Sequence, residues 1–203
     1  TSVIGYLTLL RDEEQISEAL RRKYLAISLE KAERLEDLIN EFFEITRFNI
    51  TNIHLELSRI NLTRMLEQIT FEFQPMLSEK NLRCIPPEFQ IRIDVDKMQR
   101  VFDNLMKNAV NYSFENDTIE ISVIPEPEQV RIIFENHGNP IPKEKLERIF
   151  EQFYRLDTAR TSKSGGAGLG LAIAKEIVEL HRGKIRAESE EETIRFEVSL
   201  PLL

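Results

Sequence analysis

The residues best suited to chemistry in this sequence are glycines that run into a predicted helix. Four of the seven glycines fall in residues 165–170, at Gly165, Gly166, Gly168 and Gly170. Glycine lets the backbone approach a ligand closely, and a helix start offers free amide donors and a positive dipole end. The cluster suits a phosphate, although glycine density alone fits a flexible loop equally well. The spacing matches neither a P-loop nor the dinucleotide fingerprint.

A second candidate is a polar edge on the helix predicted over residues 95–112. Asn104, Asn108 and Asn111 share one stripe of that helix. Asparagine is a mediocre helix former, so a merely solvated face would more readily use Glu, Lys or Gln. A carboxamide oxygen suits Mg²⁺, which needs few protein ligands. The neighbouring stripe, predicted to be buried, comprises Met98, Val101, Phe102, Leu105, Ala109 and Tyr112.

A third candidate is the turn after a predicted strand that ends at Glu135. Asn136 and Gly138 begin this turn, which continues through Pro140 and Pro142. A polar group at a strand end, beside a glycine, is able to recognise the edge of a base by hydrogen bonds. Taken alone, the segment fits a structural turn better.

These motifs need elements to position them, and the first fifty residues predict a helical hairpin. Residues 1–49 contain one glycine and no proline. A break follows Arg11, with Asp12 and Gln15 placed as a capping box for the second helix. We expect two such hairpins to pair as a four-helix bundle; the alternative is a hairpin packed on its own globular domain. The bundle seam comprises Leu20, Tyr24, Ile27, Leu35, Leu38, Phe42 and Ile45.

The rest of the chain alternates predicted strands and helices. Several strands follow one another without an intervening helix, which favours an α+β fold: a two-layer sandwich with a mixed sheet and helices on one face. Strands are predicted over residues 53–57, 118–124, 130–135, 184–188 and 193–200, and helices over residues 62–77, 95–112, 143–150 and 169–181.

Composition excludes several classes of partner. The formal net charge of -8 over 203 residues provides no basic field for nucleic acid. Cys84 is the only cysteine, so neither a disulfide framework nor a thiolate zinc site can form. No apolar run approaches the roughly 18 residues that span a bilayer. We therefore expect no nucleic-acid partner and no direct membrane contact from this segment.

Together the motifs resemble the ATP-binding domain of histidine kinases, within the superfamily of gyrase, Hsp90 and MutL ATPases. NLMKNAVNYS resembles the family's asparagine box, ENHGNPIP its first glycine box, IFEQFYRLD its phenylalanine box and GGAGLGLAIAKEIVELHRGKI its second glycine box. TSVIGYL and EFFEITRFN resemble the ends of the phosphoacceptor box and of the second dimerisation helix. The sequence as a whole most resembles vancomycin-resistance sensors of the VanS type. The resemblance makes residues 1–49 a truncated dimerisation and phosphoacceptor hairpin, and residues 50–203 a catalytic ATP-binding domain.

The resemblance implies ATP and Mg²⁺ as cofactors, with Asn108 as the metal ligand. Asn136 stands where the family has an adenine-reading aspartate, and Pro140 replaces its second glycine. Asn111 replaces a phosphate-contacting lysine of many relatives, a charge that Arg155 and Arg160 are candidates to supply. The residues expected around the nucleotide are Asn104, Asn108, Asn111, Tyr112, Asn136, Gly138, Ile141, Arg155, Arg160, Gly166, Gly168, Leu169 and Gly170.

The implied function is transfer of the ATP γ-phosphate to a histidine on the dimerisation helix, and then to an aspartate of a response regulator receiver domain. The expected setting is the cytoplasmic portion of a membrane-anchored bacterial sensor. The acceptor belongs upstream of Thr1, so we expect this segment not to autophosphorylate. His54, His137 and His181 are expected to be surface or structural residues.

Two alternatives stay open. A degenerate ATP-binding or scaffold module is favoured by Asn136 and Asn111. A serine kinase of the anti-sigma type shares the ATP domain but should lack the hairpin. Branches of the superfamily that hydrolyse ATP place a glutamate one turn before the magnesium asparagine, where this chain has Asn104. Hydrolysis is therefore expected to be slow.

Overall fold

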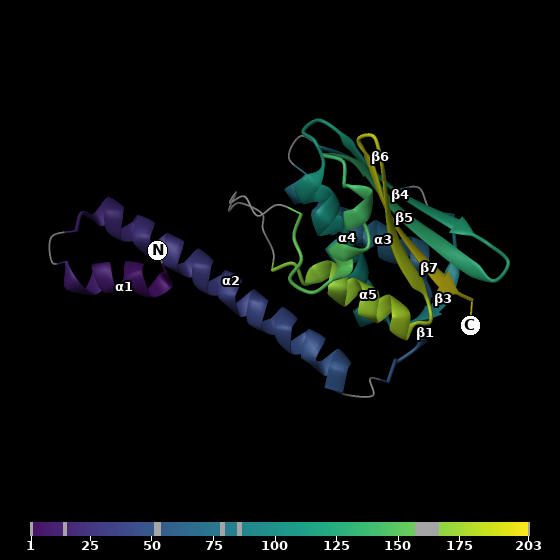
Figure 1. Cartoon of the computed structure of the whole chain (residues 1–203), viewed down its shortest axis with the longest axis horizontal. Helices are drawn as coiled ribbons and strands as arrows, with labels where there is room; N and C mark the ends of the chain where they lie inside the picture. The colour runs from purple at the N-terminus through teal and green to yellow at the C-terminus, as the bar shows by residue number, and fades with distance from the viewer. Residues whose placement is uncertain are drawn as a thin grey trace. The chain divides into compact units, whose positions relative to one another are not determined.

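A computed structural model describes residues 2–13, 16–50, 54–77, 80–84, 87–156 and 167–202. The chain separates into two units, residues 1–47 and 48–203. The first is a hairpin of α1 (Val3–Asp12) and the long α2 (Glu18–Ile50), purple to blue in Figure 1. Among the described residues, no helix is both long enough and apolar enough to cross a membrane.

The hairpin begins its second helix differently from the expectation. Asp12 is the last residue of α1 and pairs with Arg11, and Gln15 lies outside the described residues. The Ser17 hydroxyl instead accepts a hydrogen bond from the Leu20 amide at 3.3 Å, immediately before α2. A serine side chain in that position satisfies an amide that the helix itself leaves free. The expected capping box at Asp12 is therefore wrong.

The second unit is built on a five-stranded mixed sheet. β2 is parallel to β4, and every other neighbouring pair is antiparallel. Figure 1 shows the helices of this unit on one face of the sheet, which confirms the expected α+β sandwich. In spatial order the strands are β2 (Asn81–Cys84), β4 (Thr118–Pro125), β5 (Gln129–His137), β7 (Thr193–Pro201) and β6 (Lys184–Glu190). The helices are α3 (Leu62–Phe73), α4 (Val95–Tyr112) and α5 (Gly170–Leu180).

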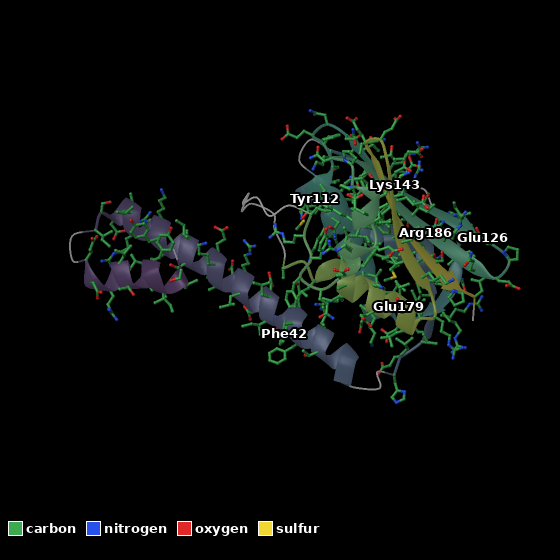
Figure 2. All side chains as sticks on the ribbon, viewed as in Figure 1. Phe42, Tyr112, Glu126, Lys143, Glu179 and Arg186 are labelled. Carbon is green, nitrogen blue, oxygen red and sulfur yellow. The ribbon has the colours of Figure 1, made fainter. Side chains whose placement is uncertain are left out.

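The core lies between this sheet and its helices. Inward side chains alternate along β5, and the ring of Phe134 stacks on Phe102 of α4 with centroids 5.8 Å apart. The buried stripe of α4 is as predicted, with Met106 added. Tyr112 is an exception, because it is the last residue of the helix and is 52% exposed. Figure 2 labels Tyr112 at the end of α4.

The opposite face of the sheet carries a network of ion pairs. Glu197 is buried on β7, yet it contacts Arg131 of β5 and Arg186 of β6, each at 3.0 Å. Arg131 also pairs with Glu126 at 2.6 Å. A buried carboxylate is tolerated when cations offset its desolvation. The two arginines provide that compensation.

Three predicted elements differ in the structure. The strand expected over residues 53–57 is instead β1 (Ser58–Asn61), which pairs with β3 (Gln90–Ile93). Residues 54–57 form no ladder, and the Glu56 amide donates to the Asp94 carboxylate at 3.0 Å. Residues 143–150 form two short 3₁₀ turns, Lys143–Lys145 and Arg148–Phe150, rather than a helix.

The helix expected over residues 62–77 also ends early. α3 stops at Phe73, and a 3₁₀ turn with Pro75 near its start follows over Gln74–Met76. Proline has no amide hydrogen and cannot continue the helical bonding. β2 and β3 were not predicted, because each has only four residues.

Asp94 fixes the start of α4. Its carboxylate accepts from the Lys97 amide at 3.2 Å, as an N-cap does, and pairs with Lys97 Nζ at 2.7 Å. Its backbone amide donates to Nε2 of His181, whose Nδ1 lies 2.8 Å from the Ile177 carbonyl oxygen. Nδ1 must therefore carry the hydrogen and Nε2 the lone pair. The buried His181 is a neutral structural residue that joins α5 to α4.

Both titrating groups of this junction have shifted pKa values. Burial lowers the pKa of His181, and this outweighs the Ile177 carbonyl and the Asp94 charge, which raise it. Burial raises the pKa of Asp94, but hydrogen bonds from Lys97 and from the Glu56 amide outweigh burial, so the net shift is downward. As the pH falls, protonation of the unfolded chain at His181 therefore begins to reduce the stability of the fold at a higher pH than protonation at Asp94 does.

We expect the second unit to lose stability as the pH falls below about 6.5, the ordinary histidine pKa. Below that pH the unfolded chain binds a proton that the folded chain resists, so the free energy of unfolding decreases. Urea unfolding followed by circular dichroism, between about pH 7.5 and 5.5, measures this slope. His181→Gln should flatten it, whereas His54→Gln, at an exposed histidine, should not. An unchanged slope in His181→Gln would contradict the assignment.

Candidate functional site

The asparagine edge of α4 lies at the border of the core. Asn104 and Asn108 are half-buried, and Asn111 is exposed. Asn108 Nδ2 donates to the backbone oxygen of Asn104 at 2.8 Å. A carbonyl oxygen only accepts, so the amide must present its NH₂ group to it. Asn108 Oδ1 is thereby turned away and left for another partner, which suits a hard cation such as Mg²⁺.

The start of α5 meets this edge at Gly170. A Cβ atom on Gly170 would lie 3.0 Å from Asn104 Oδ1. Leu169, the buried N-cap residue, makes no side-chain hydrogen bond to the helix. The N-cap side chain therefore leaves the first amides of α5 unsatisfied, and this helix start lies beside Asn104. Such amides, with the positive end of the helix dipole, attract an anion.

Gly168 ties the second glycine box to the phenylalanine box. Its φ of 76° is left-handed, and a Cβ atom there would lie 2.7 Å from the Tyr154 carbonyl oxygen. The Gly168 carbonyl accepts from the Phe153 amide at 3.0 Å. The exposed Arg155 passes alongside, with Cγ 3.3 Å from the same Cβ position. Only glycine allows this close contact. The contact also places Arg155 beside the residues that directly precede α5.

The first glycine box lies at the other end of α4. A Cβ atom on Gly138 would lie 2.3 Å from the Tyr112 carbonyl oxygen, so only glycine lets β5 pass this closely. Ser113 and Gly138 form an isolated antiparallel bridge. Asn136 is buried at 2% exposure, and its Nδ2 has no hydrogen-bond partner among the described residues. Ile141 is also buried, and its amide donates to Ser189 Oγ at 2.9 Å.

The expected residues thus form two clusters along α4. Asn104 and Tyr112 are separated by about 12 Å, since a helix rises about 1.5 Å per residue. A ligand that touches both clusters must be elongated, with an anionic end at α5 and a hydrogen-bonding end at Asn136. Arg160 and Gly166 lie outside the described residues. Sequence analysis did not identify three further residues near this site, because their roles depend on contacts distant in sequence. They are Ser113, which bridges to Gly138, Ser189, which accepts from Ile141, and Asp117, whose carboxylate contacts the His137 ring.

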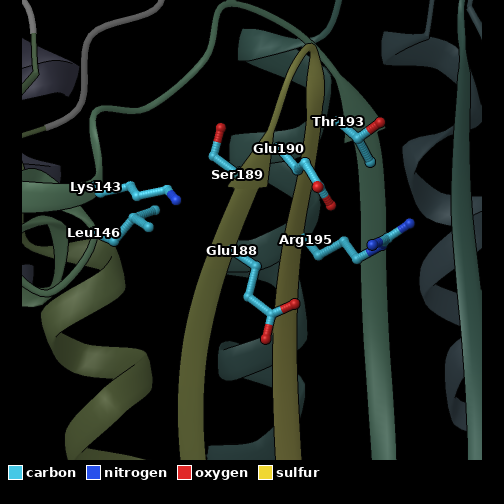
Figure 3. Close-up of a pocket in the computed structure, with 7 residues that line it drawn as sticks. All are labelled: Lys143, Leu146, Glu188, Ser189, Glu190, Thr193 and Arg195. Carbon is cyan, nitrogen blue, oxygen red and sulfur yellow. The ribbon is translucent and has the colours of Figure 1, made fainter.

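A surface pocket borders the cluster that contains the first glycine box. It has a volume of about 390 Å³ and contains none of the expected residues. Figure 3 shows Lys143 and Leu146 on one side of it and residues of β6 and β7 on the other. It adjoins the first glycine box, because Ser189 both lines it and accepts from Ile141. The lining is Lys143, Leu146, Glu188, Ser189, Glu190, Thr193 and Arg195.

Comparison with known families agrees with this geometry. Residues 93–203 match the family described as histidine kinase-, DNA gyrase B- and HSP90-like ATPase. The chain belongs to this ATPase family. The matched residues begin just before α4 and include α5, so they contain both clusters of the candidate site.

Two sensor proteins of this family are similar in sequence to the chain over nearly its whole length. The chain is 50% identical to the sensor protein VanSC of Enterococcus gallinarum, over 99% of this chain and 56% of that protein. It is 48% identical to the sensor protein VanS of Enterococcus faecium, over 100% of this chain and 53% of that protein. These identities confirm the resemblance to VanS-type sensors. The chain spans just over half the length of both relatives.

A solved histidine kinase shares the fold over both units. The histidine kinase ThkA, in complex with the response regulator protein TrrA, aligns with a TM-score of 0.79 at 25% identity. The match covers 99% of this chain and 57% of that one.

Proposed function

We propose that residues 50–203 bind magnesium-ATP and supply the γ-phosphate in a sensor histidine kinase. The observation that carries the proposal is that Asn104, whose backbone oxygen holds the Asn108 amide, lies against the start of α5, where the N-cap residue makes no side-chain hydrogen bond. A neutral oxygen aimed outward and free helix amides form a setting for a metal-bound phosphate chain. When bound, Mg²⁺ would supply positive charge to the phosphate oxygens.

The other expected residues complete the proposal. Asn108 Oδ1 holds the metal, and Gly168, Leu169 and Gly170 present amides to the phosphates. At the far end of α4, Asn136 faces the purine base, with Tyr112, Gly138 and Ile141 around it. Arg155 and Arg160 supply positive charge near the phosphates, Gly166 presents its backbone amide to them, and Asn111 lies along the same edge of α4.

The chemistry at Asn104 favours transfer of the phosphate over hydrolysis. An ATPase needs a base to take a proton from the attacking water. An amide has no basic site for that proton, and Asn104 occupies the position one turn before Asn108. The γ-phosphate is therefore kept for a protein nucleophile, the imidazole of a histidine on the dimerisation helix. A response regulator receiver domain is the proposed next acceptor.

We propose further that the hairpin, assigned to residues 1–49, pairs with that of a second copy of the chain. One residue of the expected seam already packs within the single hairpin, because the Tyr24 ring contacts the Tyr6 ring with centroids 5.3 Å apart. Phe42, labelled in Figure 2, remains 49% exposed on α2. A second apolar stripe at heptad spacing, which the sequence reading missed, comprises the exposed Leu25, Leu29, Ile39 and Phe43. A four-helix bundle would bury both stripes.

The nucleotide proposal predicts that Asn108→Ala removes most of the magnesium dependence of ATP binding. Isothermal titration of residues 1–203 with millimolar ATP, in Mg²⁺ and in EDTA, measures this. We expect Mg²⁺ to tighten wild-type binding by about tenfold or more, and the variant to lose that gain. Asn40→Ala, at an exposed asparagine of α2, is the matched control. No binding of ATP by the wild-type chain would end the proposal.

The transfer step predicts an acid-labile phosphate on a longer stretch of the protein that begins upstream of Thr1. The longer stretch and residues 1–203 are each incubated with ATP labelled at the γ-phosphate. Only the longer stretch should become labelled, and the label should be lost in acid because a phosphorus–nitrogen bond hydrolyses there. An acid-stable label would indicate a serine kinase, and no label on either would favour the scaffold.

Pairing of the hairpins predicts that Leu29→Glu converts a dimer into a monomer. Leu29 is 61% exposed in the single chain, and a carboxylate buried at a helix seam is strongly disfavoured. Light scattering after size-exclusion chromatography gives the mass. Lys23→Glu introduces the same residue at an exposed position outside both stripes and should leave the dimer intact. A wild-type chain that is monomeric at high concentration would refute the pairing.

A further inference from the structure

Asn136 is a buried amide that the described protein does not satisfy. It lies on β5, opposite Ile194 of β7, with the helix-facing side chains of that strand. Its side chain is 2% exposed, and its Nδ2 lacks a hydrogen-bond partner within the described ranges. Buried polar groups are paired in almost all native structures. An unpaired donor at the base end of the site therefore indicates that a ligand completes it.

The backbone groups of the two residues after Asn136 form hydrogen bonds with other parts of the chain. The His137 amide donates to Asp117, and the His137 carbonyl accepts from the Phe114 amide at 2.9 Å. The Gly138 amide donates to the Glu192 carbonyl at 2.8 Å. These groups are already engaged with other residues. The Asn136 side chain can turn end for end, which exchanges its NH₂ group and its oxygen.

The difference between an amide and a carboxylate decides which purines fit. An ionised carboxylate only accepts hydrogen bonds, whereas an amide both donates and accepts. Adenine presents an amino donor at C6 beside an acceptor at N1. A 6-oxopurine presents the reverse, an oxygen at C6 beside an N1 hydrogen. A carboxylate that faces C6 accepts from the adenine amino group and repels the 6-oxo oxygen, but an amide that faces C6 pairs with either group after one rotation.

We propose that Asn136 lets this site take 6-oxopurine nucleoside triphosphates as well as ATP. The inference rests on the proposed function, because it requires Asn136 to face the base. It differs from that function in predicting weak discrimination at C6 of the purine. Rotation of this one side chain exchanges its donor and its acceptor, so the proposal requires no change in the backbone.

Inosine triphosphate is the probe, since it differs from ATP at C6 and N1 and adds no group at C2. Isothermal titration of residues 1–203 with each magnesium nucleotide gives the ratio of dissociation constants. We expect the two constants to agree within about tenfold for the wild-type chain. Asn136→Asp should retain ATP and weaken inosine triphosphate by about tenfold or more relative to ATP, because a carboxylate cannot donate to the 6-oxo oxygen.

The matched control is Asn139→Asp, which adds the same charge at an exposed position of the turn and should leave the ratio unchanged. A wild-type preference for ATP of about a hundredfold or more would overturn the inference while the proposed function stands. An unchanged ratio in Asn136→Asp would overturn it as well. If the wild-type chain binds neither nucleotide, both proposals fail. The wild-type ratio decides the matter even if Asn136→Asp does not fold.

Discussion

The position of α4 is the constraint on which the rest of the site depends, and the buried Asp94 sets it. One carboxylate caps the helix, pairs with Lys97 and holds the Glu56 amide, while the Asp94 backbone holds His181 of the α5 terminus. Three separate segments of the chain, at Glu56, at the start of α4 and at the end of α5, thereby meet at one residue. α4 cannot slide along its axis without breaking several of these bonds together.

A fixed α4 carries the two ends of the site with it. Gly170 lies against Asn104 near the middle of the helix, and Gly138 lies against the Tyr112 carbonyl at its end. The contact at Gly138 leaves no room for a side chain, and a Cβ atom at Gly170 would crowd the Asn104 amide. The glycines therefore act as spacers that set how near α5 and β5 come to α4. The distance between the anionic end and the base end follows from the rise of a single helix.

Much of this arrangement was accessible from sequence, because the elements involved are long and periodic. The bounds of α4 and its apolar stripe follow from helical spacing, and the long strands follow from alternation. The short β2 and β3 could not be predicted, since four residues carry too little pattern. Residues 53–57 alternate like a strand, but the Glu56 amide is used by Asp94. The unpaired Asn136 amide depends on burial, which a single sequence does not show.

In the proposed metal site, the bond from Asn108 to the Asn104 carbonyl also limits which ligand α4 can carry. A carboxylate would attract a cation more strongly than an amide does. It has no hydrogen to offer the backbone, however, and its charge would be repelled by the carbonyl oxygen. Aspartate at this position would lose the anchor that aims the oxygen outward. In the proposed site the helix thus offers a well-directed neutral ligand in place of a charged one, and the phosphates of the nucleotide would provide most of the negative charge around the metal.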